Sequence, residues 1–589
     1  MTTFVNRNEL NASIPVPILG LNTLDDKSQM NPLMAPNFYN CEMDDPRGIA
    51  KRSGFTRFNT GMLPITFTGT ITSITTQSVG AATGVVWSGV VTAGLRFRMA
   101  SGTNIYTVSG LANNATLTLT SSFVDTVNTG SYYISSDVRG LAPFKYGTTQ
   151  KLVAFADASI FNLGTGASGE PANLNDTLTS GTRFSWTTFQ DKFYYCNGYE
   201  FNTWDGATTI AAVGGTPAPD DPLYVTTYVN GNATWLVIVG SNTQADMSDI
   251  AFSDVNAPGT WPAANIYPVG DRDGGRAIAA KQCPSGLLIF KTNGIYMFGG
   301  IPGSSGSLRR VSSIGCNSPH SIVEYEGAIY FVGDREGRLG VFRYIGGNTI
   351  QSLADSIEPS LADLKKSVVN QICGSIYDNK YYISGTSSTG TFNDRHFICY
   401  INRPFEDAGR MFFPWAEGSR GYNFLSTVDI SGTDYLFSGS PTTGYVYRED
   451  NGETDDTTDN IFGNAAAIDA YVTTKFYDFG VPAYNKELLR AYVNINAVGA
   501  WGINLDVYKD FQTYGYDRYP ISVDTNALTW AEVVFGVTPW QTAVGKTIAE
   551  VTFRYPQTAR YFQFKWSNAT ASQYFTVFPM NLFFKQEAN

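Results

Sequence analysis

The chain has 589 residues, of which 43% are hydrophobic and only 15% are charged, and its formal net charge is −11. This length exceeds what one hydrophobic core usually serves, so we expect two to four structural units. The 58 glycines, 34 tyrosines and 38 phenylalanines favour strands joined by tight turns over long helices, and the negative charge argues against a surface that binds nucleic-acid phosphates.

The N-terminal segment, 1–64, is predicted to be an arm rather than an independent domain. Its first residues lack the charged and apolar regions of a signal peptide, and no apolar run in the sequence approaches the about 18 residues of a membrane span. We therefore expect a soluble chain with neither a signal peptide nor a membrane anchor. The arm contains a strand-like piece, Pro46 to Phe58, which could pair with the last unit of a closed ring.

Residues 65–137 have a different character from the rest of the chain. Thr, Ser, Gly and Val dominate, and short alternating runs are separated by Gly or Asn. This pattern predicts four or five short strands. We expect a small inserted β-barrel, after which another pattern begins near Arg139.

A strand-turn-strand unit recurs from 138 to 450. Successive units are about 41 to 54 residues apart, whereas β-propeller blades repeat at about 40 to 50 residues and a string of sandwich domains would need about 100 per unit. The pattern therefore predicts a β-propeller of about seven blades, with six or eight as the alternatives. The units are marked by Leu152, Phe193, Leu236, Leu288, Ile329, Tyr381 and Tyr435.

Local signals inside this repeat predict two turns and one helix. Asn197-Gly198 and Asn293-Gly294 are pairs that type I′ hairpin turns favour, because both central residues of such a turn need positive φ. Ser356 to Ser367 is the one helix of note that the sequence predicts, with Ser356 as a possible cap and Pro359 near its start.

The acidic stretch Asn451 to Asn460 is predicted to be an exposed linker or loop. After it, residues 465–589 alternate with period two over several runs separated by Gly, Pro and Asn, a pattern typical of an antiparallel β-sandwich. The predicted fold class is thus all-β, a β-propeller of about seven blades with a small inserted β-barrel and a C-terminal β-sandwich.

The cysteines and histidines offer little support for a catalytic, metal-binding or redox site. His320 and His396 are the only histidines, and neither lies in a motif that would support a Ser-His-Asp triad or a multi-histidine metal site. We interpret both as structural. The six cysteines stand singly, without the close pairs of zinc or redox sites, and are interpreted as reduced, mostly buried small hydrophobes: Cys41, Cys196, Cys283, Cys316, Cys373 and Cys399.

Two carboxylate pairs are candidates for a glycosidase site, which needs two carboxyl groups about 5 to 9.5 Å apart. They are Asp271 with Asp273 and Asp334 with Glu336. Both pairs stand beside glycines in turn-like contexts with an arginine nearby, so solvated hairpin tips are the favoured interpretation. The segment Ser253 to Trp261 is superficially similar to the Asp-box turn of sialidases, but its spacing is longer and it occurs once.

Other ligand-binding motifs are weak. The acidic run Asp450 to Asp459 lacks the ordered alternation of oxygen ligands that a calcium loop shows, and the sequence has no Gly-rich phosphate loop. We assign no catalytic, cofactor-binding or metal-binding residue and expect no cofactor. The protein is not expected to be an enzyme.

Several segments resemble a known family, the β-propeller tail proteins of tailed bacteriophages. Asn31 to Phe58, with its Arg-Ser-Gly-Phe sequence, looks like the opening of these proteins. The order of the later pieces is similar as well: Ser253 to Gly270, then the run GLLIFKTNGIYMFGG, then Ser312 to Tyr344, and finally a sandwich containing ARYFQFKWSN. The resemblance covers most of the chain, but the inserted segment 65–137 departs from shorter members of the family.

This family includes the tail nozzle, tail hub or stabilisation protein of short-tailed phages. The resemblance implies a virion structural protein, made in the host cytoplasm, that forms a hexameric ring below the portal and adaptor. Its partners would be the adaptor above and needle, tip or fibre proteins below. Genomic DNA would pass through the channel without sequence-specific binding. No catalytic residues are implied.

Two other functions stay open at this point. One is a glycan-binding or glycan-hydrolysing propeller, such as a tail adhesin or a sialidase-like protein, which would place two carboxyl groups and exposed aromatic side chains at one cleft. The other is a bacterial propeller scaffold without any link to a phage.

Overall fold

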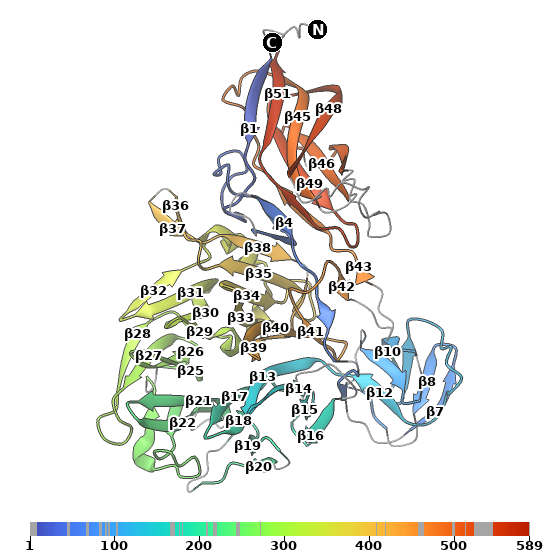
Figure 1. The fold of residues 1–589 in the computed structure, drawn as a ribbon. Helices are drawn as coiled ribbons and strands as arrows, with labels where there is room; N and C mark the ends of the chain where they lie inside the picture. The colour runs from blue at the N-terminus through green and yellow to red at the C-terminus, as the bar shows by residue number, and fades with distance from the viewer. Residues whose placement is uncertain are drawn as a thin grey trace, which may run out of the picture.

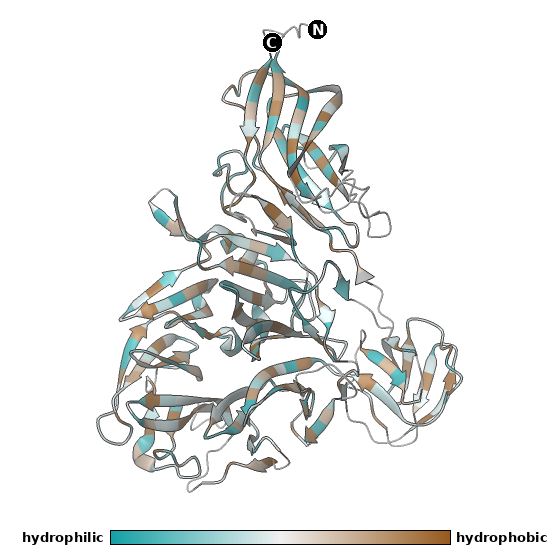
Figure 2. Cartoon of the chain, in the orientation of Figure 1, coloured by the Kyte–Doolittle hydropathy of each residue, from teal (hydrophilic) through white to brown (hydrophobic). Residues whose placement is uncertain are grey.

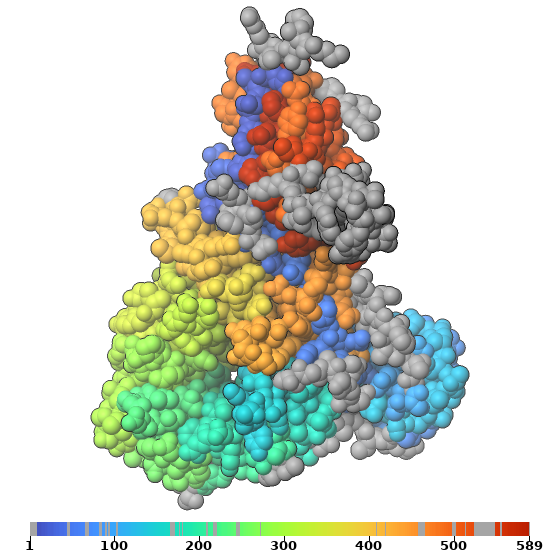
Figure 3. Space-filling model, viewed as in Figure 1, coloured from blue at the N-terminus to red at the C-terminus, as the bar shows by residue number. Residues whose placement is uncertain are grey.

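The computed structural model shows three parts: a propeller, a small barrel beside it and a sandwich above it (Figure 1). It describes residues 9–587 except 44–47, 60, 66–69, 82–84, 89–90, 92, 94, 102–103, 165–170, 176, 180, 208–209, 216–220, 243–247, 271–272, 408, 419, 457–464, 498–500, 513 and 524–545. In the space-filling view the barrel forms a lobe at the side of the propeller (Figure 3).

The propeller has seven four-stranded antiparallel blades, which confirms the predicted all-β propeller architecture. All seven marker residues of the sequence repeat lie on the second strand of their blades. The first two blades are β13 (Val138–Tyr146), β14 (Thr149–Ala156), β15 (Ser159–Asn162) and β16 (Ala172–Asn175), then β17 (Ser185–Phe189), β18 (Lys192–Cys196), β19 (Phe201–Trp204) and β20 (Ile210–Ala212). The third, fourth and fifth blades are β21 (Pro222–Asn230), β22 (Ala233–Ser241), β23 (Asp249–Phe252) and β24 (Ile266–Pro268), then β25 (Ala277–Cys283), β26 (Gly286–Lys291), β27 (Gly294–Gly299) and β28 (Ser307–Ser312), then β29 (Val323–Tyr325), β30 (Ala328–Arg335), β31 (Arg338–Gly346) and β32 (Thr349–Ser352). The sixth and seventh blades are β33 (Cys373–Tyr377), β34 (Lys380–Gly385), β35 (Arg395–Tyr400) and β38 (Trp415–Gly418), then β39 (Phe424–Ile430), β40 (Thr433–Gly439), β41 (Val446–Arg448) and β5 (Thr56–Arg57).

The first strands of successive blades contact one another in a closed circle, from β13 through β39 and back to β13, so they are the innermost strands of the ring. The ring is closed by the N-terminal segment, because β5 pairs with β41 as the outer strand of the seventh blade. Closure of this kind removes the exposed edge that an unpaired last blade would leave.

Turn chemistry differs from the prediction at the two Asn-Gly pairs. Of these four described residues only Gly198 has positive φ, at 88°. A four-residue connection follows Cys196, and the Asn293-Gly294 pair is split because Gly294 already begins β27. Two-residue turns with positive φ at both positions occur instead between other strands, at Gln190-Asp191, Glu326-Gly327, Glu336-Gly337, Asp378-Asn379 and Ser431-Gly432.

The predicted helix Ser356 to Ser367 is shorter than expected. The α-helix α1 covers Glu358–Ala362, and the 3-10 helices η3 (Asp355–Ile357) and η4 (Lys366–Gln371) flank it. Ile357 rather than Ser356 is the N-cap, and it makes no side-chain capping hydrogen bond. Two further 3-10 turns are η1 (Ala263–Asn265) and η2 (Pro319–Ser321).

The barrel is one seven-stranded sheet. A bridge between Ile71 and Gly130 brings its last strand back beside β12 and closes the sheet on itself. Its core contains Trp87 and Phe97, both fully buried. The strands, in sheet order, are β6 (Pro64–Ile65), β12 (Tyr132–Ser135), β9 (Arg96–Met99), β10 (Tyr106–Asn113), β11 (Thr116–Leu119), β8 (Ser78–Ala81) and β7 (Ile71–Thr75).

The sandwich contains strands from both the N-terminal segment and the C-terminal part of the chain. Strand β1 pairs along its whole length with β51, and the buried Lys51 Nζ donates to Asn568 Oδ1 at 2.9 Å. One sheet contains β1 (Leu10–Ile14), β51 (Met580–Gln586), β45 (Lys486–Ala497), β50 (Phe575–Val577), β4 (Ile49–Lys51) and β3 (Cys41–Glu42), with β48 (Lys546–Ala559) paired to β45.

The other sheet of the sandwich continues from the propeller. It runs from the sixth blade through β2 (Asn37–Tyr39) to β44 (Ala470–Thr473), β49 (Phe562–Asn568), β46 (Trp501–Lys509) and β47 (Asp517–Val523), which makes nine strands. The connection is a parallel contact between Tyr39 and Glu417. Two small hairpins complete the fold: β36 (Phe405–Asp407) with β37 (Arg410–Phe412), and β42 (Asp455–Asp456) with β43 (Ala465–Ala466).

Apolar and polar residues alternate along the strands (Figure 2), as expected of sheets with one face in a core. Separate apolar clusters fill the gaps between neighbouring blades. The largest cluster extends from Tyr330 in the fifth blade, through Trp415 in the sixth, to Trp566 and Phe584 in the sandwich. Propeller and sandwich therefore share a hydrophobic core.

Candidate functional site

The innermost strands of the propeller begin around a polar pocket of about 930 Å³. Each of the seven blades contributes a residue at or just before its first strand: Arg139, Arg183, Leu223, Ile278, His320, Gln371 and Asn423. A second cavity of about 310 Å³ lies along the first strands and shares Pro319 and His320 with the pocket. The two cavities therefore lie next to each other at the centre of the propeller. We call the larger one the mouth pocket.

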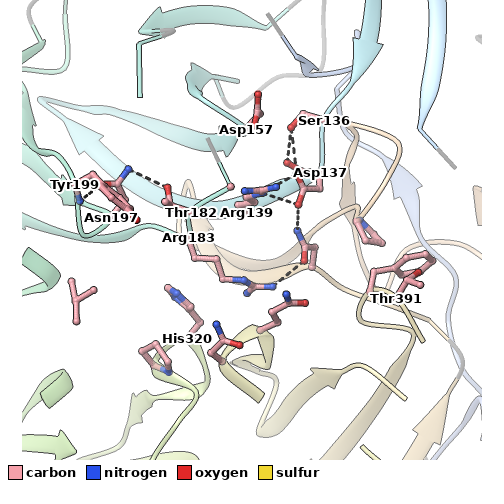
Figure 4. Close-up of a pocket in the computed structure, with 18 of the residues that line it drawn as sticks. Ser136, Asp137, Arg139, Asp157, Thr182, Arg183, Asn197, Tyr199, His320 and Thr391 are labelled. Atoms are coloured by element: carbon pink, nitrogen blue, oxygen red, sulfur yellow. Dashed lines mark hydrogen bonds and ion pairs between the residues drawn. The ribbon is translucent and has the colours of Figure 1, made fainter. Parts of the chain in front are cut away.

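Hydrogen bonds join three blades at one side of the mouth pocket (Figure 4). Arg139 Nε donates to the carboxylate of Asp137 at 2.8 and 2.9 Å. Asn423 donates to the Val138 carbonyl at 2.8 Å and accepts from Arg183 Nη2 at 2.9 Å. The chain thus holds both guanidinium groups in fixed positions, one from the first blade and one from the second.

Neither guanidinium is fully satisfied. Nη1 of Arg139 and Nη1 of Arg183 are buried and have no hydrogen-bond partner among the described residues. Burial lowers the pKa of Arg183, and the positive charge of Arg139 acts in the same direction. An unpaired buried donor costs about 1–3 kcal/mol, so both groups are held in place at a cost to stability.

A third arginine lines the same pocket from the fourth blade. Arg276 Nη2 donates to the Ser241 carbonyl and to Asn242 Oδ1, both at 2.8 Å. Its Nε is buried without a partner in the described part of the chain, and burial lowers its pKa. In the contacts described, Arg276 is therefore held by neutral groups and has no carboxylate partner.

His320, one of the two predicted structural histidines, lies in the mouth pocket on η2. Its ring packs edge-on against Phe424, with the ring centroids 5.2 Å apart. Burial, and secondly the charge of Arg183, lower the pKa of His320 to about 3. The imidazole is therefore neutral at physiological pH and adds no charge to the site.

Polar and aromatic side chains form the rim of the mouth pocket. Asn197 Nδ2 donates to Thr182 Oγ1 at 3.1 Å. Tyr199 is 55% exposed and Phe392 is 40% exposed, and both line the pocket. Such surfaces combine hydrogen-bond donors and acceptors with flat apolar faces, which suits polar ligands with apolar faces.

Of the carboxylates singled out in the sequence, Asp273, Asp334 and Glu336 are described by the structure, and none of the three lines the mouth pocket. Asp271 lies outside the described residues. Asp273 is a structural ion-pair partner, with Oδ1 2.6 Å from Lys291 Nζ and Oδ2 accepting from Tyr296 at 2.9 Å. Burial alone would raise the pKa of Asp273, but hydrogen bonds from Lys291, Gly275 and Tyr296 outweigh it and lower the pKa to about 2.

The second pair lies at a hairpin tip. Asp334 Oδ1 accepts the Gly337 N–H at 2.7 Å, and Glu336 occupies a positive-φ turn position at 55°. The segment Ser253 to Trp261 forms the connection between β23 and β24, where Asp254 N–H donates to the Thr260 carbonyl at 2.7 Å. These residues shape turns of the blades.

His396 lies on β35 and is only 1% exposed. Its Nδ1 is 3.0 Å from the Arg420 carbonyl oxygen. Burial, and secondly the charge of Arg52, lower its pKa to about 3. All six cysteines are buried and free.

The acidic stretch contributes to the junction between propeller and sandwich rather than to the mouth pocket. Asp455 and Asp456 form β42, and residues 457–459 of the predicted acidic run lie outside the described residues. Among the residues described, there is no group of three His, Cys, Asp or Glu side chains that could hold a metal ion. Within that same part of the chain, none of the helices has both the length and the apolar character to cross a membrane.

The arginines of the mouth pocket were missed by the sequence interpretation. Arg139, Arg183 and Arg276 each stand within a few residues of the start of a first strand, in three different blades. If the repeats are aligned on their first strands, rather than on the more apolar second strands, these arginines occupy neighbouring positions of the repeat. That alignment is the signal that could have found them.

The sequence matches no protein-family model and no curated protein. Several solved structures match the chain at low identity and low TM-score. The extracellular domain of a one-component system from B. thetaiotaomicron is 10% identical over 80% of this chain (TM-score 0.36), and the chain spans 65% of its length. The Myceliophteria thermophila Cps50 (Swd1) β-propeller domain is 11% identical over 53% of this chain and 96% of its own (TM-score 0.32). Bacteroides ovatus xyloglucan PUL GH43B is 11% identical, and the match covers 77% of this chain and 98% of that protein (TM-score 0.23). The β-propeller architecture is established by the seven blades themselves.

Proposed function

We propose that this protein is a non-enzymatic structural subunit of a phage tail, a nozzle or hub protein that assembles into a ring around the DNA exit channel. The observation that carries the proposal is the nine-stranded sheet that runs without a break from the sixth blade into the sandwich. This arrangement, together with the resemblance of Asn31 to Phe58 and the later segments to phage propeller proteins, supports a permanent building block.

Rigidity is what the proposal requires of the subunit. In a ring with head-to-tail contacts, each subunit presents two different surfaces, and the angle between them decides whether the ring closes. Here the shared sheet and the cluster that extends from Tyr330 to Phe584 hold propeller and sandwich together. A subunit of this kind would keep that angle constant.

Charge supports the same role. The formal net charge is −11, because 51 acidic residues outnumber 40 basic ones, and this excess opposes adhesion of DNA phosphates. We expect the wall of the channel to carry net negative potential, so that the genome can leave without adhering to it. A continuous belt of Lys and Arg along the bore of the assembled ring would contradict this expectation.

The test is the assembly state of the full chain. Light scattering after gel filtration and negative-stain electron microscopy should show closed rings, with six copies as the expected number. Phage particles should contain the protein in multiple copies, and particles made without it should fail to retain DNA. A chain that stays monomeric at high concentration and is absent from particles would overturn the proposal. Tyr199→Ala, in the mouth pocket, should leave the rings unchanged.

A second candidate function is glycan binding at the mouth pocket, as in a tail adhesin. The observation that favours it is the pocket itself, about 930 Å³ in volume and lined by arginines, amides and the exposed rings of Tyr199 and Phe392. Saturable binding of saccharides that Tyr199→Ala weakens would support it. The two functions are compatible, because binding at the propeller axis does not require the ring contacts.

A further inference from the structure

We infer that the mouth pocket binds an acidic saccharide, with the guanidinium groups of Arg139 and Arg183 receiving the anionic group of the sugar. This inference rests on the glycan-binding candidate function and adds the class of glycan to it. It depends on three features of the pocket: unpaired donors, excess positive charge, and a size and rim that suit a sugar ring.

The unpaired donors come from two adjacent blades. Arg139 and Arg183 are each fixed by hydrogen bonds to the chain, to Asp137 and to Asn423 respectively. Each nevertheless leaves a buried Nη1 without a partner in the described part of the structure. Gly181 lies next to Arg139, because a Cβ atom there would come within 3.4 Å of that Nη1. Two prepositioned guanidinium donors suit the paired oxygens of a carboxylate or the oxygens of a sulfate.

Positive charge is in excess at this place. The charged residues that line the mouth pocket are Arg139, Arg183 and Arg276 against Asp137 and Asp157. Asp137 is occupied by its ion pair with Arg139. In Figure 4 the side chain of Asp157 points away from Arg183. Arg183 donates to the neutral Asn423 and also interacts with the thiol of Cys373. The carboxylate that acts on it is that of Asp137, which is already paired with Arg139, so an anionic ligand would supply a second negative charge for the two guanidinium groups.

Size and rim argue for a sugar acid rather than a bare inorganic anion. The mouth pocket, at about 930 Å³, is far larger than one oxyanion needs. Tyr199 and Phe392 offer exposed aromatic faces on which a sugar ring can pack. Asn197 and Thr182 add side-chain hydrogen-bonding groups beside them.

The experiment compares three probes on the full chain: D-glucuronate, D-glucose and inorganic sulfate. Calorimetry gives each dissociation constant, and thermal unfolding in the presence of each probe gives an independent shift. Because a charge-assisted hydrogen bond is about twice as strong as a neutral one, we expect D-glucuronate to bind at least about tenfold more tightly than D-glucose. Sulfate should bind more weakly than D-glucuronate, since it cannot contact the aromatic rim.

Variants separate recognition of the anionic group by the arginines from packing of the sugar ring on the aromatic rim. Arg183→Gln should reduce D-glucuronate affinity about tenfold or more, whereas Tyr199→Ala should weaken D-glucuronate and leave sulfate unchanged. Arg309→Gln, on the outer strand β28 and away from the mouth pocket, is the control and should change neither. If Arg183→Gln does not fold, Arg183→Lys retains the charge and loses the paired donors, and it should also weaken binding.

Each outcome decides a different part of the inference. Equal affinity for D-glucose and D-glucuronate, with sensitivity to Tyr199→Ala, would overturn the acidic class and leave glycan binding standing. Sulfate binding as tight as D-glucuronate, unaffected by Tyr199→Ala, would show an anion site without sugar recognition and overturn the inference. The absence of saturable binding for all three probes would overturn both the inference and the glycan-binding function, while leaving the ring proposal untouched.

Discussion

Arg52 and Asp455 form a bidentate ion pair, with Nη1 2.8 Å from Oδ1 and Nη2 2.6 Å from Oδ2. Their side chains are 8% and 15% exposed. Arg52 follows β4 in the sandwich and Asp455 begins β42 after the last blade. The pair therefore joins the N-terminal segment to the chain that leaves the propeller, beside the strand that closes the ring.

Replacing Arg52 with Lys should destabilise the protein. Lysine cannot make two parallel hydrogen bonds to one carboxylate, and loss of a buried pair costs about 3–5 kcal/mol when one charge is left uncompensated. Lys retains the charge, so we expect a loss at or below the lower end of that range, measured by chemical or thermal unfolding. Arg338→Lys is the matched control, because the Arg338–Glu358 pair is 78% and 42% exposed and should contribute little. Equal effects of the two substitutions would contradict the role given to Arg52.

Asn59→Ala should weaken ring closure. The buried Asn59 accepts the Val446 N–H through Oδ1 at 2.7 Å and so extends the pairing of the closing strand with β41. Alanine would leave that N–H unpaired, at a cost of about 1–3 kcal/mol. Limited proteolysis should then cleave the seventh blade earlier than in the parent chain. The exposed Asn348→Ala serves as the comparison, and similar cleavage rates in both variants would rule out a special role for Asn59.

Asp273→Asn tests whether this carboxylate is structural. The substitution removes the charge that compensates Lys291, whose side chain is fully buried, and should cost about 3 kcal/mol. The pKa of Asp273 is about 2 in the folded state and about 4 in the unfolded chain, so its stabilisation is present above pH 4 and is lost as the pH falls towards 2. Unfolding measured across that window should show a shallower decline for the variant. Glu336→Gln, at the exposed tip of the β30–β31 hairpin, is the control and should change stability by less than about 0.5 kcal/mol.

His396→Gln should reduce the sensitivity of the fold to mild acid. The pKa of His396 is lowered to about 3 in the folded protein and is about 6.5 when unfolded. Between these values the unfolded chain binds the extra proton, so the stabilisation is complete above pH 6.5 and falls by about 1.4 kcal/mol per pH unit below it. Thermal unfolding from pH 7.5 to 5 should therefore show a smaller decrease for His396→Gln than for the parent chain. Equal pH slopes would show that His396 takes up its proton equally in the folded and unfolded states, so that its pKa is not lowered by folding.

Much of the propeller could be predicted because its pairing is local. Each blade folds on neighbouring residues, so the apolar second strands marked by Leu152 and Tyr435 carry the repeat in the sequence itself. The place of the N-terminal segment could not be predicted in the same way. Lys51 contacts Asn568, and β1 pairs with β51 across nearly the whole chain, so no local pattern reports these contacts.

The candidate site shows the same limit. The carboxylate pairs Asp271–Asp273 and Asp334–Glu336 stand out because they are close in sequence, yet Asp273 and Asp334 serve turns and ion pairs. The arginines of the mouth pocket are far apart in sequence and are brought together by the ring. Asp273 and Asp334 thus have structural contacts, in line with the favoured interpretation of these pairs as hairpin tips. The arginines that line the mouth pocket become neighbours only through the closed circle of first strands, which no short stretch of sequence reveals.

The pairing of β1 with β51 also orders events during synthesis. At about 5–20 residues per second, roughly half a minute to two minutes separate the appearance of β1 from that of β51. The blades can form one after another on the ribosome, and the ring can close once β41 has been made, because its closing strand β5 comes from the N-terminal segment. Strand β1, in contrast, has no partner until β51 has been made, so copies terminated before β51 would contain a closed propeller and an incomplete sandwich.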